Sequence, residues 1–280
     1  MLESAFYGQN QSSFSDASKL MNRALSIEVN KETMREITEE IGRLVHEADT
    51  KKAVHILDNM HEIEVKPDGD RKGVLYIMTD GAAVNTRVKD ENGSTWRENK
   101  TVIGFSNKDM IKRKDGSNII VKKEYAAYIG SAEKFKGYVL DTAIRAGYGK
   151  TSEIVIIGDG ATWIRNMGKE LFPEAVQILD LYHLKENIYN YAKYKFSNNE
   201  KEYVPWAEIF IDKIEKGKTQ DALLLLPEKE KLPASVVNIV SLSKPFLSTS
   251  RINITITHYT ALTVSWQQKT AWRLQTTKLL

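Results

Sequence analysis

The chain has 280 residues, of which 41% are hydrophobic and 28% charged, as expected of a globular protein with one large or two smaller domains. It has no cysteine, no long apolar run and no signal-peptide pattern, which excludes disulfides, thiolate zinc sites and a membrane span and predicts a cytoplasmic protein. The net charge of +3 does not indicate nucleic-acid binding, because residues 1–230 hold 34 basic and 37 acidic side chains.

The first 65 residues predict a helical region. A short helix is expected over 12–25, and a second over 31–50 follows Asn30, a residue type that caps helices well. Apolar residues recur at three and four positions along the second helix. Such a pair is compatible with a helix-turn-helix remnant of a DNA-binding region, whereas a plain helical hairpin packed on the main domain is the commoner arrangement. A turn-rich linker is expected over 51–70.

Residues 70–197 predict a catalytic core with a mixed α/β fold. Three apolar stretches come first, and helices then alternate with two further strands. Short connections favour antiparallel pairing of the first three strands, and helical crossovers favour parallel addition of the others, which is the ribonuclease H-like order. No glycine-rich phosphate loop follows the first strand, so a Rossmann domain is excluded. The expected strands are 73–80, 101–105, 118–130, 152–160 and 175–180, and the expected helices are 131–149, 161–172 and 181–196.

Two acids stand at the ends of predicted strands. Asp80 closes the first strand and Asp159 the fourth, and each is followed by Gly-Ala. If these strands are neighbours, the two carboxylates converge at one sheet edge and form a catalytic and metal site for Mg²⁺ or Mn²⁺. The alternative is that each Asp-Gly pair is only a turn.

Further residues are candidates for supporting roles. Asp180 ends the last predicted strand, and His183 begins the next helix, where it can contact phosphate or hold the active-site edge by hydrogen bonding. Basic and aromatic side chains near the strands are candidates for DNA contacts, by phosphate binding and by stacking. These DNA-binding candidates are Trp96, Arg97, Lys100, Trp163 and Arg165.

Three segments carry a family resemblance. YIMTDGAAV, WRENKTVIGF and IVIIGDGATWIRNMGKELFPEAVQILDLYHLKENIYNYAK resemble the bacterial DDE-type transposases of the ISLre group, distant relatives of the Mutator-like transposases, and the likeness covers about residues 10–233. It implies a ribonuclease H-like, Mg²⁺-dependent DNA recombinase that cleaves phosphodiesters and transfers strands during transposition. It also implies catalytic Asp80 and Asp159, an Asp180–His183 element, transposon-end and target DNA as partners, and a homo-oligomer.

The sequence departs from that family in two places. Family members are longer at the N-terminus, and they carry a third acid, a Glu in a small-residue motif after a helical insertion. Residues 198–232 are helical in texture and match the start of such an insertion, but residues 231–280 contain no acid. We therefore expect a frameshift near 233–240, a poorly ordered tail or adventitious strand over 233–280, and a copy with little or no cleavage activity.

Two other functions remain open at this point. The alternatives to a transposase are a DNA-binding remnant without chemistry and a ribonuclease H-like nuclease of another kind. The nuclease would need a different third acid on a helix facing the two aspartates, and the candidates are Glu200, Glu202 and Glu208. Joint metal binding by Asp80 and Asp159 separates the enzymes from the remnant.

Overall fold

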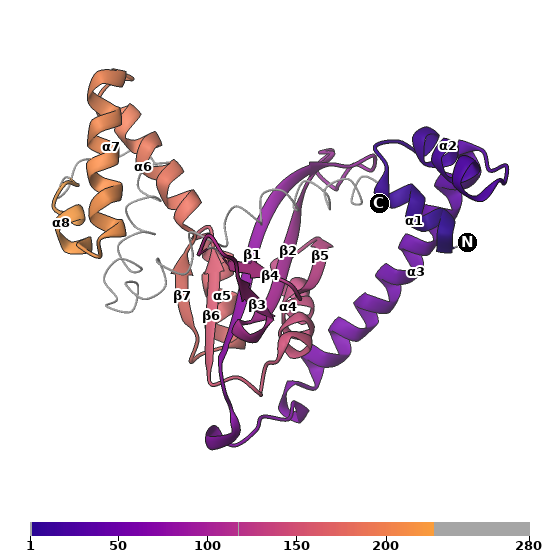
Figure 1. Ribbon diagram of the computed structural model, residues 1–280, viewed down its shortest axis with the longest axis horizontal. Coiled ribbons are helices and arrows are strands. Elements are labelled where there is room, and N and C mark those ends of the chain that lie inside the picture. Colours follow the sequence, from indigo (N-terminus) through magenta and orange to yellow (C-terminus); the bar gives the residue numbers. More distant parts are fainter. Residues whose placement is uncertain (1, 117, 227–280) are drawn as a thin grey trace.

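The computed structural model describes residues 2–116 and 118–226 (Figure 1). The predicted tail over 233–280 lies outside them. The helices are α1 (Leu2–Asn10), α2 (Phe14–Leu25), α3 (Lys31–Asp58), α4 (Ala132–Ala146), α5 (Thr162–Leu171), α6 (Leu181–Lys195), α7 (Glu200–Glu215) and α8 (Thr219–Leu223). The strands are β1 (Val74–Asn85), β2 (Trp96–Ser106), β3 (Met110–Lys112), β4 (Asn118–Ile120), β5 (Glu124–Ile129), β6 (Glu153–Gly158) and β7 (Val176–Leu179).

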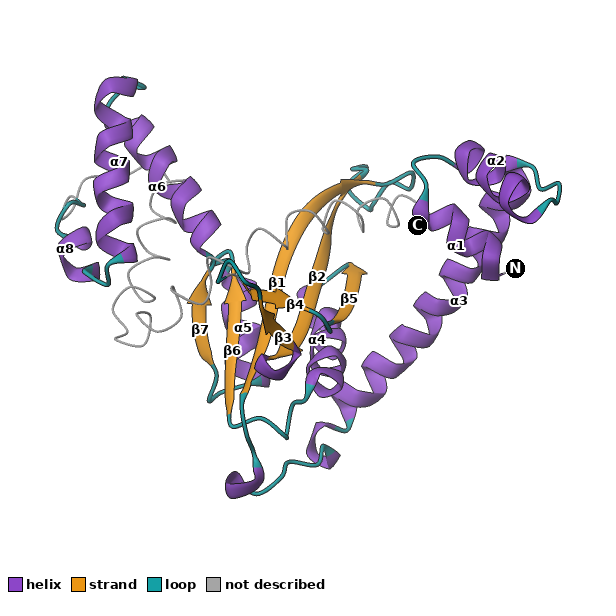
Figure 2. Cartoon of the chain, viewed as in Figure 1, coloured by secondary structure: helices purple, strands orange, loops and turns teal. Residues whose placement is uncertain are grey.

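A five-stranded mixed sheet forms the centre of the molecule, in the order β5-β2-β1-β6-β7 (Figure 2). β1 pairs antiparallel with β2, and β2 pairs antiparallel with β5. β6 joins β1 in parallel, and β7 joins β6 in parallel. The predicted mixed α/β sheet, with three antiparallel strands followed by parallel ones, is therefore confirmed. The predicted adjacency of the first and fourth strands is also confirmed.

The sheet has a hydrophobic core on each face. One core joins Leu75, Ile77 and Val102 to buried residues of α4 and α5. The other joins Met78 and Phe105 to the β3–β4 hairpin and to the α6 and α7 helices. Because alternate residues of a strand point to opposite faces, the side chain of each β1 residue is assigned to one of these two cores.

Several predicted boundaries were wrong. β1 does not end at Asp80, because its pairing with β2 continues as a two-stranded ribbon as far as Asn85 with Trp96. The predicted strand over 118–130 is two strands, since β4 pairs with β3 in a separate sheet and β5 joins the main sheet. Antiparallel pairing beyond the core residues allows the ribbon, and the apolar run alone does not reveal it.

The N-terminal helices are longer and more numerous than predicted. α1 was missed, because its sequence has a weak apolar stripe, and it packs with α2 on the N-terminal half of α3. α3 continues to Asp58, so the linker predicted from residue 51 is helical over its first eight residues. Its C-terminal half packs against α4, which leaves α1 and α2 away from the sheet (Figure 1). The helices thus do not form a plain hairpin packed on the main domain.

The α6 and α7 helices form an antiparallel pair that projects from the sheet (Figure 1). α6 begins directly after β7, and its side chains Leu184 and Ile188 are buried in the same core as Phe210 and Ile214 of α7. In the described part of the chain, no helix combines the length and apolar character that crossing a membrane requires.

Candidate active site at the carboxyl ends of three parallel strands

Three aspartates follow the register of the parallel strands. The β1–β6 pairing matches Met78 with Ile157, and two residues further on the same register places Asp80 level with Asp159. The β6–β7 pairing ends at Gly158 with Leu179, and one residue further it places Asp159 level with Asp180. Neighbouring strands lie about 4.8 Å apart, so this register gathers three carboxylates at one edge of the sheet.

Local hydrogen bonds fix one oxygen of each carboxylate. The Oδ1 atoms of Asp80, Asp159 and Asp180 accept hydrogen bonds at 2.7 to 2.8 Å from the backbone N–H groups of Gly81, Ala161 and Tyr182. The Asp180 bond caps the N-terminus of α6. Among the described residues, none of the three Oδ2 atoms accepts a hydrogen bond. The second oxygen of each aspartate is therefore available to a ligand.

Burial and mutual repulsion define the electrostatics of the site. Burial raises the pKa of the Asp80 carboxyl to about 6, a cationic His183 opposes this rise, and the carboxylates of Asp159 and Asp180 add to it. The hydrogen bond from the Gly81 N–H also lowers the pKa of Asp80. The mutual influence of these four side chains shows that Asp80, Asp159, Asp180 and His183 share one electrostatic environment. A partly buried carboxyl whose pKa is raised beside other acids is typical of functional sites.

The three aspartates offer the type of oxygen ligand that a hard divalent cation prefers, although no three His, Cys, Asp or Glu side chains of the described residues are arranged as a metal-binding group. Mg²⁺ and Mn²⁺ prefer carboxylate oxygen, and here three acids on adjacent strands each keep one oxygen that is not used by the backbone. A cation at this edge would also relieve the repulsion that raises the pKa of Asp80. His183 is partly exposed, its Nδ1 lies 3.7 Å from Glu186 Oε2, and its charge lowers the pKa of Asp80, so it lies within electrostatic reach of the acids.

The side chains of Lys100 and Trp163 lie on the face of the sheet that α4 and α5 cover, and they contact each other. Lys100 is buried, and its Nζ donates to Glu98 and to the Gly130 carbonyl oxygen at 2.8 Å. The same Nζ lies 5.3 Å from the ring centre of Trp163, whose indole also packs edge-on against Phe135. Lys100 pairs with Gly81 across the β1–β2 ladder, on the face opposite Asp80. The Lys100 ammonium group is therefore buried and bonded inside the protein, so it is not accessible for the predicted contact with DNA.

The other DNA-binding candidates are spread over the molecule. Trp96 is 60% exposed at the open end of the β1–β2 ribbon, and Arg97 beside it lies with Nη2 3.4 Å from the Val88 carbonyl oxygen. Arg165 is on α5, where its carbonyl oxygen accepts a hydrogen bond from Gln177. The five residues proposed from the sequence therefore do not form one surface.

The glutamates of α7 do not face the three aspartates. Lys185 of α6 forms an ion pair with Glu215 at 2.6 Å, so the C-terminal end of α7 is the end nearest the sheet. Glu200 and Glu202 begin α7, about 20 Å away along the helix. Glu208 is exposed, whereas its neighbour Ala207 is buried toward α6. A third acid from Glu200, Glu202 or Glu208 is therefore not supported.

Asp180, predicted from the sequence as a supporting residue, stands level with the two proposed catalytic acids. The signal that could have identified it is the spacing of the acids relative to the apolar runs. IVIIGD and VQILD each end in an aspartate at the carboxyl end of a parallel strand. Parallel strands that end together bring such residues to one edge.

Comparison with known proteins identifies a family. No curated protein matches the chain. The model of the Uncharacterised protein family UPF0236 matches residues 4–204, which include the three aspartates and His183. The match spans most of the chain, from α1 to the beginning of α7. The chain therefore belongs to the Uncharacterised protein family UPF0236.

Proposed function

We propose that this chain is the core of a metal-dependent DNA recombinase of the transposase type, built on a ribonuclease H-like sheet. The observation that carries the proposal is the common register of Asp80, within β1, with Asp159 and Asp180, which directly follow β6 and β7. Acids placed in this way hold Mg²⁺ or Mn²⁺, and two such ions activate a water or a 3′-hydroxyl for attack on a phosphodiester. The resemblance of DGAAV, GDGATWI and LDLYHL to ISLre-group transposases favours DNA as the substrate.

The three aspartates and His183 have different roles in this proposal. Asp80 and Asp159 are the metal ligands, because each keeps one uncommitted oxygen at the level where β6 ends. Asp180 is 7% exposed and caps α6, so it adds negative charge beside the two ligands and fixes the start of the helix that carries His183. A partly exposed His183 next to the acids is suited to contact a phosphate oxygen.

Metal titration tests the site directly. Isothermal titration with Mn²⁺ should show binding by the full chain, and Asp80→Asn and Asp159→Asn should each weaken it at least tenfold. Glu174→Gln is the matched control, because Glu174 is an exposed acid at the opposite end of β7, and it should bind Mn²⁺ as the unmodified chain does. Equal affinity in all four proteins would exclude a metal site at this edge.

DNA binding and cleavage form a second test. Labelled duplex and single-stranded oligonucleotides that cover the DNA flanking the gene are incubated with the protein and Mn²⁺. We expect DNA binding but little or no cleavage, because no acid of the described residues matches the third catalytic acid, a Glu, of the ISLre-group transposases. Strong cleavage that Asp80→Asn abolishes would refute the proposed inactivity and support the transposase chemistry. A lack of both binding and cleavage, despite Mn²⁺ binding, would refute the choice of DNA as substrate.

The missing Glu has its own test in the gene. Translation of all three forward frames from codon 230 onward, over about six hundred further bases, should give a helical stretch followed by a glycine-rich motif with a Glu. Restoring that frame should then restore cleavage. If no frame contains the motif, the frameshift is refuted and the non-catalytic DNA-binding remnant becomes the better description. A cytoplasmic location and a homo-oligomer follow from the same proposal.

A further inference from the structure

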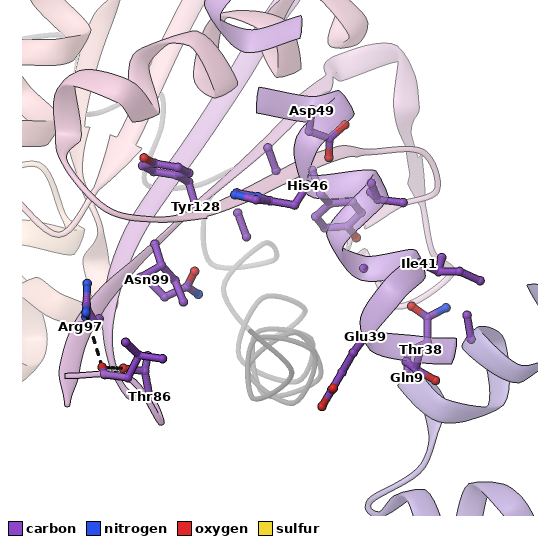
Figure 3. A pocket seen from close by; sticks show the side chains of 18 residues that line it. Gln9, Thr38, Glu39, Ile41, His46, Asp49, Thr86, Arg97, Asn99 and Tyr128 are labelled. Atoms are coloured by element: carbon purple, nitrogen blue, oxygen red, sulfur yellow. Dashed lines mark hydrogen bonds between the residues drawn. The ribbon is translucent and has the colours of Figure 1, made fainter. Parts of the chain in front are cut away.

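A groove lies between α3 and the part of the main sheet formed by β5 and the β1–β2 ribbon. Its volume is about 630 Å³, within the range of pockets that hold small molecules. In Figure 3, Arg97 and Asn99 lie across the space from Glu39. Tyr128 and His46 lie together at one end, where their rings stack with their centres 6.3 Å apart. The groove therefore offers both polar side chains and flat rings to a ligand.

Two polar groups of the groove have no hydrogen-bond partner among the described residues. Asn99 is 1% exposed, and its Oδ1, an acceptor, is buried without a hydrogen bond. The Nε of Arg97, a donor, is also buried and unpaired. Native proteins rarely leave such groups unpaired, because each has lost its hydrogen bonds to water. The two groups indicate a ligand that presents both a donor and an acceptor.

The register of the sheet connects this groove to the acid site. Asp80 of β1 pairs with Thr101 of β2, and the next pair on the same face is Ala82 with Asn99. The side chains of Asp80 and Asn99 therefore project from one face of the sheet. Thr101 also pairs with Ala127 of β5, which lines the groove. Ala127 and Asp80 are thus two strands apart in one row, about 10 Å. A nucleic-acid strand held at the acids can reach the groove with a neighbouring nucleotide.

Charge determines which part of a nucleotide fits the groove. Glu39 and Asp49 line its α3 wall, and Arg97 is the only Lys or Arg among its lining residues. Carboxylates repel phosphate oxygens, so the groove disfavours the backbone of a nucleic acid. A base is uncharged, and its Watson–Crick edge carries donors and acceptors side by side. In a duplex these groups are already paired, so the base that fits the groove is an unpaired one.

We propose that the groove binds one unpaired base of a single-stranded DNA segment whose backbone lies at the acid site. A donor on the edge of the base bonds to Asn99 Oδ1, and an acceptor on the same edge bonds to Arg97 Nε. The rings of His46 and Tyr128 supply a surface for stacking. This assignment rests on the proposed function, since it takes DNA as the substrate. It adds that the substrate is single-stranded beside the acids and that Asn99 is a residue that binds it.

Fluorescence anisotropy of the full chain with a labelled single strand, and with the duplex of the same sequence, tests the assignment. The sequence is taken from the DNA that flanks the gene. Asn99→Leu should weaken binding of the single strand at least tenfold and binding of the duplex less than twofold, because leucine is similar in size but cannot form hydrogen bonds. Asn190→Leu is the matched control, since Asn190 is exposed on α6 outside the groove, and it should bind both DNAs as the unmodified chain does.

Removal of single bases from the DNA gives a second measurement, which needs no change in the protein. A set of single strands, each with one abasic position, is titrated against the unmodified chain and against Asn99→Leu. Loss of one particular base should weaken binding to the unmodified chain at least fivefold. The same loss should leave binding to Asn99→Leu unchanged, because the two changes remove one contact and their effects do not add.

The possible outcomes separate this assignment from the proposed function. Equal single-strand affinity of the unmodified chain and Asn99→Leu overturns the base site, whereas DNA remains the substrate. An equal loss of duplex and single-strand affinity in Asn99→Leu also overturns it, because an unpaired base is then not required. If Asn99→Leu does not fold in circular dichroism, the abasic strands decide with the unmodified chain alone, and equal affinity for all of them overturns the site. A lack of any DNA binding by the unmodified chain refutes both proposals.

Discussion

Asp80→Asn tests the electrostatics of the acid site through stability. Burial and the neighbouring acids raise the pKa of Asp80 from 3.8 to about 6 in the folded protein. A carboxyl with a raised pKa destabilises the folded state when it is ionised, so the stability of the unmodified protein falls as pH rises from about 4 to about 6. The asparagine side chain is neutral and nearly isosteric, and its carbonyl oxygen can still accept the Gly81 N–H. The variant should therefore be the more stable protein above pH 6.

The magnitude follows from the same pKa. A rise from 3.8 to about 6 corresponds to about 3 kcal/mol, and partial exposure of the carboxyl reduces the expected gain to about 2 kcal/mol. For a chain of this size that is about 5 °C in melting temperature. At pH 4 the two proteins should melt together, because the Asp80 carboxyl is largely protonated when folded and only about half ionised when unfolded.

Thermal melts followed by circular dichroism, in EDTA between pH 4 and pH 8, measure the effect. The control Glu174→Gln should melt within about 1 °C of the unmodified protein at every pH, as surface substitutions usually do. Added Mn²⁺ should then reverse the order, since a ligand at 100 times its Kd stabilises by about 2.7 kcal/mol and only the unmodified protein binds it well. An Asp80→Asn protein that melts at or below the unmodified temperature at pH 8 would refute this account of the site.

Three further substitutions test the packing. Gly137→Ala should destabilise the folded protein by about 1–3 kcal/mol, because a Cβ would overlap the Ala53 carbonyl oxygen and push α3 away from α4. Gly42→Ala on α3 should instead stabilise the folded protein by up to about 1 kcal/mol in urea melts, because nothing lies within 4 Å of the added Cβ. Lys100→Met should lower the free energy of unfolding by about 1–2 kcal/mol, because Glu98, which is 45% exposed, loses its ion-pair partner. It should also reduce the change in Trp163 fluorescence on unfolding. Unchanged urea midpoints in Gly137→Ala and Lys100→Met would contradict both structural roles.

Much of the core could be predicted from the sequence because its strands are short apolar runs bounded by turns. GVLYIMTD and SEIVIIGDG gave the positions of β1 and β6, and the helix between β5 and β6 required a parallel crossover. Once β1 and β6 are parallel neighbours, Asp80 and Asp159 must lie at the same level of the sheet, since each follows the buried apolar part of a strand and the two strands run in the same direction. Local pattern and chain direction are sufficient for this part of the site.

Other features depend on partners distant in sequence, and only the tertiary structure decided them. The ribbon of β1 and β2 beyond Asp80 exists because the two strands pair outside the core, where no apolar pattern marks them. The burial of Lys100 depends on Glu98 of the same strand and on Gly130 and Trp163, which are distant in sequence. Exposure of a lysine is the usual expectation from sequence, and it fails where a carboxylate, a carbonyl oxygen and an aromatic ring replace water.

The same division holds for the third aspartate and the N-terminal helices. The sequence by itself determined that Asp180 follows the apolar run of β7, but the 21-residue offset between β6 and β7 decided that it stands level with Asp159. The 28-residue α3 packs its C-terminal half on α4, and this contact places α1 and α2 away from the sheet. The spacing of apolar residues within one segment determines which face of that segment is buried. How far two segments pack along each other depends on the side chains of both, so it cannot be read from either sequence alone.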